Sequence, residues 1–470
     1  MISNYIFRNF PKQSDLIEVI QRTKCYLVIA SLFLVTEMQS QTTFTSVQSG
    51  NYSDPATWGT TTAPTSDDHV VISSGNTVTL DDILTAQNVT ISGTLNCTEA
   101  SPDFIVNGNL TVNNGGLFDG IFYFTTSWGG YDKGIQLTVA GNIINNGRIN
   151  LSIGSTYSPE GVLKLNGSTV QTVSGLGTFG GTIYTTDNSN NGAVINQLVI
   201  DNSSTATPNV IWTFNNIKIK GVLTLTNGRV DLGSNKMIVG NYATASTNCP
   251  TGNGFLNGTI GKWYDAYATF PAIASGSDYY NSKAVFPFIS STGESRDAFI
   301  SRTTDSDSAV SGELSVTYYD AAGLSTGLSI ADGSYTITDV FEGAWSIAKD
   351  ANYDFPSGTH TIAFAINDAY LIKNGNSRIF KVDETTAGNH QTGTTTPFAA
   401  RTGLATADLD NTFQVGFNAA LDSPVTSVQT GNWNDAATWS TNAIPSCADT
   451  VTILSGHTIT VNTDGSVAGV

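Results

Sequence analysis

Paired carboxylates are the residues of this chain with the clearest potential for chemistry. The pairs are Asp67 with Asp68, Asp81 with Asp82, and Asp305 with Asp307. Two carboxylates that converge on one groove can act as the acid and the base of glycoside hydrolysis, and carboxylate oxygens also bind calcium. The segment DSDS at residues 305–308 lacks the other ligands of an EF-hand loop. We therefore expect no cofactor, with calcium left as the one alternative.

The histidines do not extend these pairs into a catalytic or metal site. His69, His360, His390 and His457 each lack a carboxylate or cysteine at ligand spacing. The sequence also contains no HExxH or P-loop motif. We predict no catalytic residue, no metal ligand and a protein that is not an enzyme. A glycosidase stays open as an alternative, because two carboxylates have no local signature.

Aromatic clusters are the best candidates for ligand binding, because exposed rings can stack on sugar faces. One cluster is FDGIFYFTTSWGGY at residues 118–131, and another surrounds residue 264. The alternative is that these rings fill a core or a domain interface. The candidate ligand-binding residues are Trp128, Tyr131, Trp263 and Tyr264.

A segment that occurs twice without a gap sets the organisation of the chain. SVQSGNYSDPATWGTTTAPTSDDHVVISSGNTVTLD spans residues 46–81, and SVQTGNWNDAATWSTNAIPSCADTVTILSGHTITVN spans residues 427–462, 381 positions later. A long-period repeat indicates a modular architecture. The shared residues that we expect to be structural are Trp58, Pro64, Asp68 and Gly75 in the first copy and Trp439, Pro445, Asp449 and Gly456 in the second.

The second copy is followed by only a few residues, up to Val470. A module that ends after its opening strands cannot bury its apolar face. We therefore expect this chain to be a fragment of a longer product.

Charge and composition exclude several classes of partner. The net charge is −18, from 38 acidic and 20 basic residues. This balance argues against nucleic acid, which is bound by Lys and Arg at its phosphates, and against an anionic membrane surface. Charged residues make up 12% of the chain, against roughly 25% in an average soluble protein. Thr, Ser, Asn and Gly take their place, which favours β structure.

The N-terminus has the pattern of an export signal over residues 1–40. Arg22 and Lys24 precede the apolar run CYLVIASLFLV, which is too short for a permanent anchor. We expect an extracellular or outer-cell-surface protein without a membrane span after cleavage. Cys97, Cys249 and Cys447 then remain, so at least one thiol is unpaired within this chain.

The strand patterns predict an all-β protein. Residues 46–100 form the first repeat module, and residues 101–245 continue with short strands separated by Asn-Gly or Gly-Asn. This predicts a right-handed parallel β-helix whose Asn residues stack at the corners, with an antiparallel sandwich as the alternative. Longer strands in residues 255–422 indicate an antiparallel β-sandwich. Residues 427–470 are the second, truncated module.

The repeat resembles the opening unit of large cell-surface proteins exported by the type IX secretion system. The resemblance lies in Gly-Asn-aromatic, Asp-Pro/Ala-Ala-Thr-Trp, a Pro, Asp-x-Val-x-Ile and Gly-x-Thr-Val-Thr. It is also similar to the start of the eight-glycine domain of extracellular proteins. LTLTNGRVDLGSNKMIVG and VFEGAWSI resemble the solenoid-like and sandwich parts of such surface proteins. The resemblance implies surface display or release, usually through a C-terminal sorting domain.

These observations favour an exported, non-enzymatic scaffold of adhesin-like type. Its partners would be extracellular glycans or cell-surface components. The alternatives are a carbohydrate-binding part of a larger enzyme, or a secreted polysaccharide-active enzyme on a β-helix.

Overall fold

The computed structural model describes residues 41–82, 84–98, 103–126, 129–151, 161–180, 193–240, 247–250, 252–264, 284–302, 311–321, 323–354, 358–366, 377–381, 386–391, 398–418, 425–440, 442, 444–445 and 451–462. The protein is all-β, as predicted, and the helical turns in these ranges are α2 (Pro55–Trp58), η2 (Thr406–Asp408) and η3 (Ala436–Thr438). Within the same ranges, no helix is long and apolar enough to span a membrane. The predicted signal in residues 1–40 lies outside the described residues.

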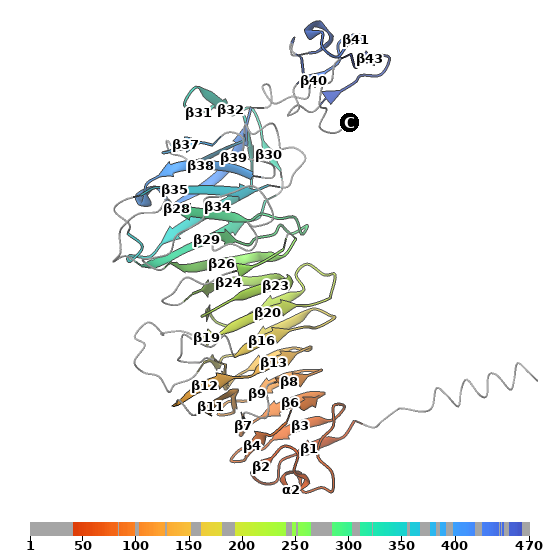
Figure 1. Ribbon diagram of the computed structural model, residues 1–470, viewed down its shortest axis with the longest axis vertical. Coiled ribbons are helices and arrows are strands. Elements are labelled where there is room, and N and C mark those ends of the chain that lie inside the picture. The colour runs from red at the N-terminus through yellow and green to blue at the C-terminus, as the bar shows by residue number, and fades with distance from the viewer. Residues whose placement is uncertain are drawn as a thin grey trace, which may run out of the picture.

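Three parallel sheets build the N-terminal part of the molecule (Figure 1). We call them sheets A, B and C. From β3 to β18 the chain adds one strand to sheet A, then one to sheet B, then one to sheet C, and then returns to sheet A; we call one such round a passage. Sheet A starts with β1 (Thr43–Thr45), β3 (His69–Ile72), β6 (Asn88–Ile91), β9 (Leu110–Val112), β14 (Ile143–Asn145), β17 (Gln171–Ser174) and β21 (Val210–Trp212). Sheet B contains β2 (Gly50–Asn51), β4 (Thr77–Leu80), β7 (Thr94–Cys97), β10 (Leu117–Asp119), β15 (Arg148–Asn150) and β18 (Thr178–Phe179). Sheet C contains β5 (Leu84–Ala86), β8 (Asp103–Val106), β13 (Gln136–Val139), β16 (Val162–Leu165), β20 (Gln197–Asp201), β23 (Leu223–Asn227) and β25 (Thr247–Asn248).

The alternation of apolar and polar residues explains this stacking. Val70 and Ile72 of β3 are buried, whereas His69 and Val71 between them are partly exposed. Alternate side chains of a strand point to opposite faces, so one face of each strand turns inward. Parallel pairing aligns Val70 with Val89 and Ile72 with Ile91, and the next strands continue both columns. Each passage of the chain therefore places its apolar residues directly on those of the previous one.

Asparagine side chains connect successive passages where the chain enters sheet A. The Asn109 backbone N–H donates to the Asn88 Oδ1 at 2.7 Å, and the Asn142 N–H donates to the Asn109 Oδ1 at 2.8 Å. The Thr172 N–H donates to the Asn142 Oδ1 at 2.8 Å. This ladder gives hydrogen-bond partners to backbone N–H groups just before or at the start of strands of sheet A.

A single strand joins the parallel part to an antiparallel part. β26 (Gly254–Tyr264) pairs in parallel with β24 (Arg229–Val239) along one edge and antiparallel with β29 (Gly312–Tyr319) along the other. β19 (Ala193–Ile195) and β22 (Ile217–Ile219) also belong to sheet A, on the parallel side. Strand pairing thus links the part of the chain before residue 245 with the part after residue 255, although the sequence suggests a domain boundary between them.

Two antiparallel sheets face each other in the region of residues 284–418. Sheet A continues there through β29, β30 (Leu324–Ser325), β33 (Asp339–Phe341), β34 (Ala344–Lys349), β36 (Arg378–Lys381) and β39 (Asn411–Phe417). Sheet D contains β27 (Val285–Phe286), β28 (Ala298–Arg302), β35 (His360–Ala365), β37 (Asn389–His390) and β38 (Phe398–Leu404). The Trp345 ring of sheet A stacks on the Phe364 ring of sheet D, with centroids 4.4 Å apart. Apolar contacts between the two sheets therefore form the core here.

The second copy of the repeat has the same strand pairing as the first. β40 (Val425–Thr426) pairs with β42 (Val451–Thr452), and β41 (Gly431–Asn432) pairs with β43 (Ile459–Thr460). The aligned residues Phe44 with Val70 and Gly50 with Val78 pair in the same way in the first copy. In Figure 1 the second copy lies at the end of the long axis opposite β2 and α2.

We expect Trp58→Phe and Trp439→Phe each to lower the free energy of unfolding of their own copy by about 1 kcal/mol, because each removes an indole N–H that donates to a buried carbonyl. Trp58→Ala, which also removes the ring, is expected to cost roughly 3–5 kcal/mol. Urea denaturation with hydrogen exchange at β2 and β41 measures these losses. Equal stability of Trp58→Phe and the parent chain would contradict the proposed role of the N–H.

Candidate functional site

The expected structural residues of the repeat occupy equivalent places in the two copies. The Trp58 Nε1–H donates to the Tyr52 carbonyl at 2.8 Å, and the Trp439 Nε1–H donates to the Trp433 carbonyl at the same distance. Both tryptophans are buried, and each packs edge-on against the aromatic ring six residues earlier. Their surroundings give them a structural role and leave no ring face for a ligand.

Asp68 ties the start of the first copy to the turn after Pro64. Its carboxylate accepts hydrogen bonds from the Thr42 N–H at 3.1 Å, the Thr65 N–H at 2.8 Å and the Thr65 hydroxyl at 2.7 Å. Burial alone would raise the pKa of Asp68, but these hydrogen bonds and the nearby His69 leave it below its ordinary value. Asp68 is thus an ionised carboxylate whose hydrogen bonds stabilise the local fold.

The remaining repeat residues are a proline pair, a glycine pair and one aspartate. Pro64 is half-buried and Pro445 is buried. Gly75 and Gly456 have φ angles of 85° and 91°, a left-handed conformation that disfavours other residues. Asp449 lies outside the described residues.

The aromatic ligand candidates do not gather into one site. Tyr264 is 1% exposed, and its ring packs edge-on against Tyr353, with centroids 5.7 Å apart. It therefore offers no accessible face for the sugar stacking that the sequence suggested. Trp263 is half-buried and lies on the opposite face of β26. Trp128 lies outside the described residues. Of Tyr131 only the backbone pairing with Phe124 is described, in the hairpin of β11 (Ile121–Thr126) and β12 (Gly129–Gly134).

Of the carboxylate pairs and histidines, Asp68 and His69 lie near each other. Asp81 accepts hydrogen bonds from the Ser53 N–H and hydroxyl, whereas Asp305 and Asp307 lie outside the described residues. No group of three or more metal-binding side chains occurs in the part of the chain that the structure describes. The described thiols, Cys97 and Cys249, are free and buried, and Cys447 falls outside.

A buried group of ionisable residues lies where the parallel and antiparallel parts join. It consists of Cys249, Lys262 and Asp297, each 1% exposed. The Asp297 carboxylate accepts a hydrogen bond from the Phe288 N–H at 2.9 Å and another from the Ser295 hydroxyl. The Cys249 thiol donates to the Asn253 carbonyl at 3.3 Å, and the Lys262 Nζ lies 5.4 Å from the centroid of the Phe286 ring. We call these three residues the buried cluster.

Burial shifts all three pKa values of the buried cluster toward the neutral form. It raises the pKa of Asp297 to about 7, against the opposing effect of its two hydrogen bonds. It lowers the pKa of Lys262 to about 7, which the nearby Cys249 partly opposes. It raises the pKa of Cys249 well above the ordinary thiol value, and the Asp297 charge acts in the same direction. Groups with a pKa near 7 suit general acid–base catalysis, but a polymeric substrate cannot reach side chains that are 1% exposed.

We expect Lys262→Met to raise the free energy of unfolding by about 1–3 kcal/mol at pH 6, because a buried ammonium group is replaced by an apolar chain of similar volume. The folded protein releases the Lys262 proton near pH 7, whereas the unfolded chain keeps it to about pH 10.5. The stability of the parent chain therefore rises with pH over this interval, and the advantage of Lys262→Met shrinks.

Chemical denaturation at pH 6, 8 and 10 measures this trend. Lys236→Met is the control, because Lys236 forms a partly exposed ion pair with Glu313 on the other face of the sheet and should change stability by under about 1 kcal/mol. An advantage of Lys262→Met that stays constant from pH 6 to 10 would contradict the assignment.

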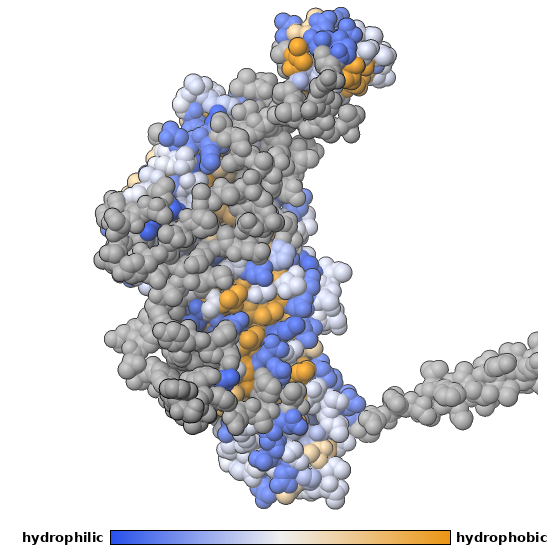
Figure 2. Space-filling view, in the orientation of Figure 1, coloured by the Kyte–Doolittle hydropathy of each residue, from blue (hydrophilic) through white to orange (hydrophobic). Residues whose placement is uncertain are grey.

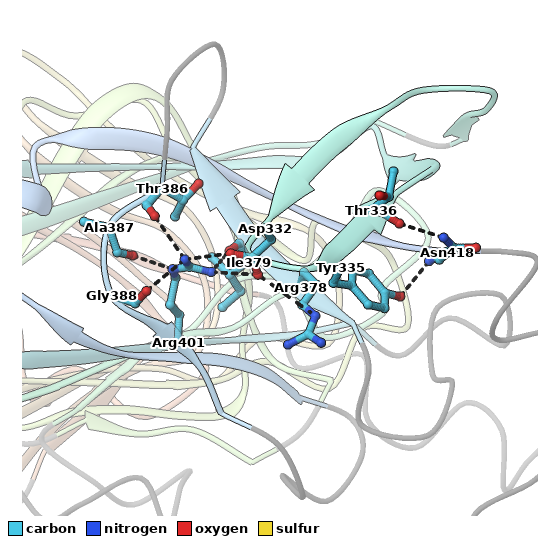
Figure 3. Close-up of polar contacts among 10 residues, drawn as sticks. All are labelled: Asp332, Tyr335, Thr336, Arg378, Ile379, Thr386, Ala387, Gly388, Arg401 and Asn418. Carbon is cyan, nitrogen blue, oxygen red and sulfur yellow. Dashed lines mark hydrogen bonds and ion pairs between the residues drawn. The ribbon is translucent and has the colours of Figure 1, made fainter.

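A second polar centre surrounds Arg401 of β38, which is 1% exposed (Figure 3). Its Nη1 and Nη2 atoms donate to the two carboxylate oxygens of Asp332 at 3.2 and 2.9 Å. The same guanidinium donates to four backbone carbonyls, at distances of 2.5–3.1 Å. These carbonyls belong to Ile379, Thr386, Ala387 and Gly388. The charge is paired and the donors are used, so this arrangement is a structural clasp.

The Arg401 clasp extends to the point where the chain leaves β39. Asp332 ends β31 (Ile330–Asp332), whose hairpin partner is β32 (Tyr335–Ile337). The Tyr335 hydroxyl accepts a hydrogen bond from the Asn418 N–H, and the Thr336 carbonyl accepts one from the Asn418 Nδ2, both at 2.8 Å (Figure 3). The hairpin thus fixes the backbone at Asn418, beyond which the second repeat copy follows in the sequence.

We expect Arg401→Lys to lower the free energy of unfolding by about 3–5 kcal/mol, because an ammonium group cannot reach the carboxylate and four carbonyls together. Arg378→Lys is the matched control. Its guanidinium lies 4.3 Å from the Tyr335 ring centroid and 4.0 Å from Asp332, so its loss should cost about 1 kcal/mol. Thermal unfolding compares the two variants, and equal losses would remove the special role of Arg401.

Sequence reasoning singled out Cys249 but not Lys262, Asp297, Arg401 or Asp332. One signal was available for Lys262, which alternates with Ile260 and Tyr264 on the inward face of β26. A lysine in an apolar column indicates a buried charge. Arg401 and Asp332 are 69 residues apart, and no local pattern connects them.

Comparisons with known proteins leave this chain without a match. No protein-family model, no curated protein and no solved structure is significantly similar to it.

Proposed function

We propose that this protein is an exported, non-enzymatic scaffold of the cell surface or extracellular space. In this proposal residues 43–248 form a β-helix-like solenoid, and residues 284–418 form a β-sandwich-like unit. The observation that carries the proposal is the recurrence of one module with the same strand register at two places in the chain. Repeated modules that stack by strand pairing build extended structures, as scaffolds and adhesins require.

The chemistry of the buried polar groups supports a structural role. Burial brings the pKa values of Lys262 and Asp297 to about 7, and both side chains are only 1% exposed. The buried guanidinium of Arg401 donates hydrogen bonds to a carboxylate and four backbone carbonyls. Such groups contribute to a defined fold and do not face a substrate.

Export and display follow from the signal-like N-terminus and from the resemblance to type IX-secreted surface proteins. Binding of extracellular glycans is a second candidate function. It is favoured by the β11–β12 hairpin, residues 121–126 and 129–134, a two-stranded sheet separate from the three parallel sheets. This hairpin is part of the aromatic cluster that contains Trp128 and Tyr131.

We expect antibodies against residues 284–418 to label intact cells of the source organism, and labelling to disappear when residues 25–35 are deleted. The purified chain should release no reducing sugar from a panel of polysaccharides. Release of sugar would overturn the non-enzymatic assignment, and labelling only after cell lysis would overturn surface display.

The same purified chain tested on a glycan panel separates the two candidate functions. Binding that disappears in Trp128→Ala with Tyr131→Ala would favour the carbohydrate-binding candidate. Trp439→Ala in the second repeat copy is the control, because its indole is buried.

A further inference from the structure

A histidine is fully buried between the two antiparallel sheets. His360 is the first residue of β35 and is 0% exposed. Its side chain shares a face of sheet D with Ile362 and Phe364, which belong to the core of the molecule. Figure 2 shows hydrophilic residues over much of the described surface, but this imidazole forms no part of it. A side chain whose ordinary pKa is about 6.5 is therefore held away from water.

Two hydrogen bonds hold His360 in its neutral form. Its Nδ1 lies 3.4 Å from the Leu404 carbonyl oxygen, which can only accept, so Nδ1 carries the proton and donates. Nε2 is then the acceptor of the neutral ring, and the Tyr353 hydroxyl donates to it at 3.0 Å. Tyr353 is itself 1% exposed, and its ring packs edge-on against Tyr264 of β26. Both ring nitrogens are thus satisfied while His360 is neutral.

A permanent cation lies beside His360 on the same face of sheet D. Arg302 of β28 is the cross-strand neighbour of His360 in the antiparallel pairing and is 5% exposed. The Cβ atoms of such directly opposite residues are about 5 Å apart. A second proton on His360 would place two positive charges side by side and would set a new N–H against the Tyr353 hydroxyl. Lys262 of β26, which lies two residues before Tyr264 on the same face, also becomes cationic below about pH 7.

We propose that His360 is the centre of an acid-sensitive latch, in which proton uptake by the imidazole separates the adjoining ends of β28, β35 and β38. The latch consists of His360, Arg302, Tyr353 and Leu404. In its closed form it ties β35 to β38 through the Leu404 carbonyl and to the segment after β34 through the Tyr353 hydroxyl. The proton comes from solvent, and only hydrogen bonds change. The latch belongs to the fold and does not depend on how the protein is exported or displayed.

The direction of the pH effect follows from the burial of His360. Burial lowers the pKa of His360 to about 4; the hydrogen bond to Leu404 opposes this shift and the Arg302 charge adds to it. The open latch takes up the proton near the ordinary value of 6.5, whereas the closed latch does so near pH 4. The closed form is therefore fully stabilised above pH 6.5 and weakens as the pH falls toward 4. Between about pH 7.5 and 5 this group alone favours opening by about 30-fold.

Asp297 acts in the opposite direction at the other end of β28. Its raised pKa of about 7, against 3.8 in water, strengthens the folded state as the pH falls through this interval. The pairing of β28 with β35 runs from Ala298 with Phe364 to Arg302 with His360, so the length of β28 separates Asp297 from the latch. Acid therefore loosens the latch end of this strand pair and tightens the Asp297 end, and only a local measurement distinguishes the two effects.

Hydrogen exchange of single amides in the full chain tests the latch. Protection factors are compared at about pH 7.5 and 5, because they remove the direct effect of pH on exchange chemistry. We expect protection of residues 300–302 and 360–362 to fall about 30-fold more in the parent chain than in His360→Gln. The glutamine stays neutral, and its amide can still donate to the Leu404 carbonyl and accept from Tyr353.

His69→Gln is the matched control for this comparison. His69 is partly exposed on β3, in the parallel part of the molecule, so its replacement should leave the pH response of the latch as in the parent. An equal pH response in the parent and in His360→Gln would overturn the proposal. A loss of protection that is as large at residues 69–72 as at the latch would also overturn it, because the opening would then not be local.

Nuclear magnetic resonance of the unmodified protein decides the case if His360→Gln does not fold. With ¹⁵N-labelled histidine, the ring that contacts Tyr353 and Leu404 should carry its proton on Nδ1 and none on Nε2. The folded molecule should keep this neutral form down to about pH 5. A folded-state imidazolium at about pH 6, or a proton on Nε2 in the neutral ring, would overturn the proposal.

Discussion

Parallel register between successive passages of the chain is the constraint on which the rest of this structure depends. Apart from the β11–β12 hairpin, the strands from β1 to β23 have only two to five residues, too few to bury an apolar face alone. Stacking in register places Val70 on Val89 and then on Leu110, so each inward residue covers the previous one. The ladder through Asn88, Asn109 and Asn142 holds the same register at the corner. Every passage is therefore stable only beside another.

A stack of this kind needs a different ending on each side, and the chain provides both. At the start, Trp58 and Tyr52 pack together beside Phe44 and close the first layer. At the far side, β26 offers its second edge to the antiparallel strand β29. That junction encloses polar groups, and the pKa values of Lys262 and Asp297 move toward neutrality because burial disfavours their charges.

The functional argument follows from where the polar groups lie. The carboxylates of Asp68, Asp297 and Asp332 hold turns, strands and an arginine in place through hydrogen bonds. Sequence reasoning expected a structural role for Asp68, because both copies of the repeat share this aspartate. It could not connect Asp332 with Arg401, because only the folding of distant strands brings them together. The sequence suggested sugar binding by Tyr264 for a similar reason. Alternation shows which residues share a face of β26, but not which of its two faces the rest of the protein covers.

The sequence by itself determined the all-β class, the repeat and the residues that build it. These are local or periodic properties: alternation fixes which residues of a strand share a face, and a gap-free repeat fixes equal strand register. Only the tertiary structure decided the join between parallel and antiparallel strands, the burial of Lys262 and the clasp around Arg401. Those features depend on contacts between strands far apart in the chain.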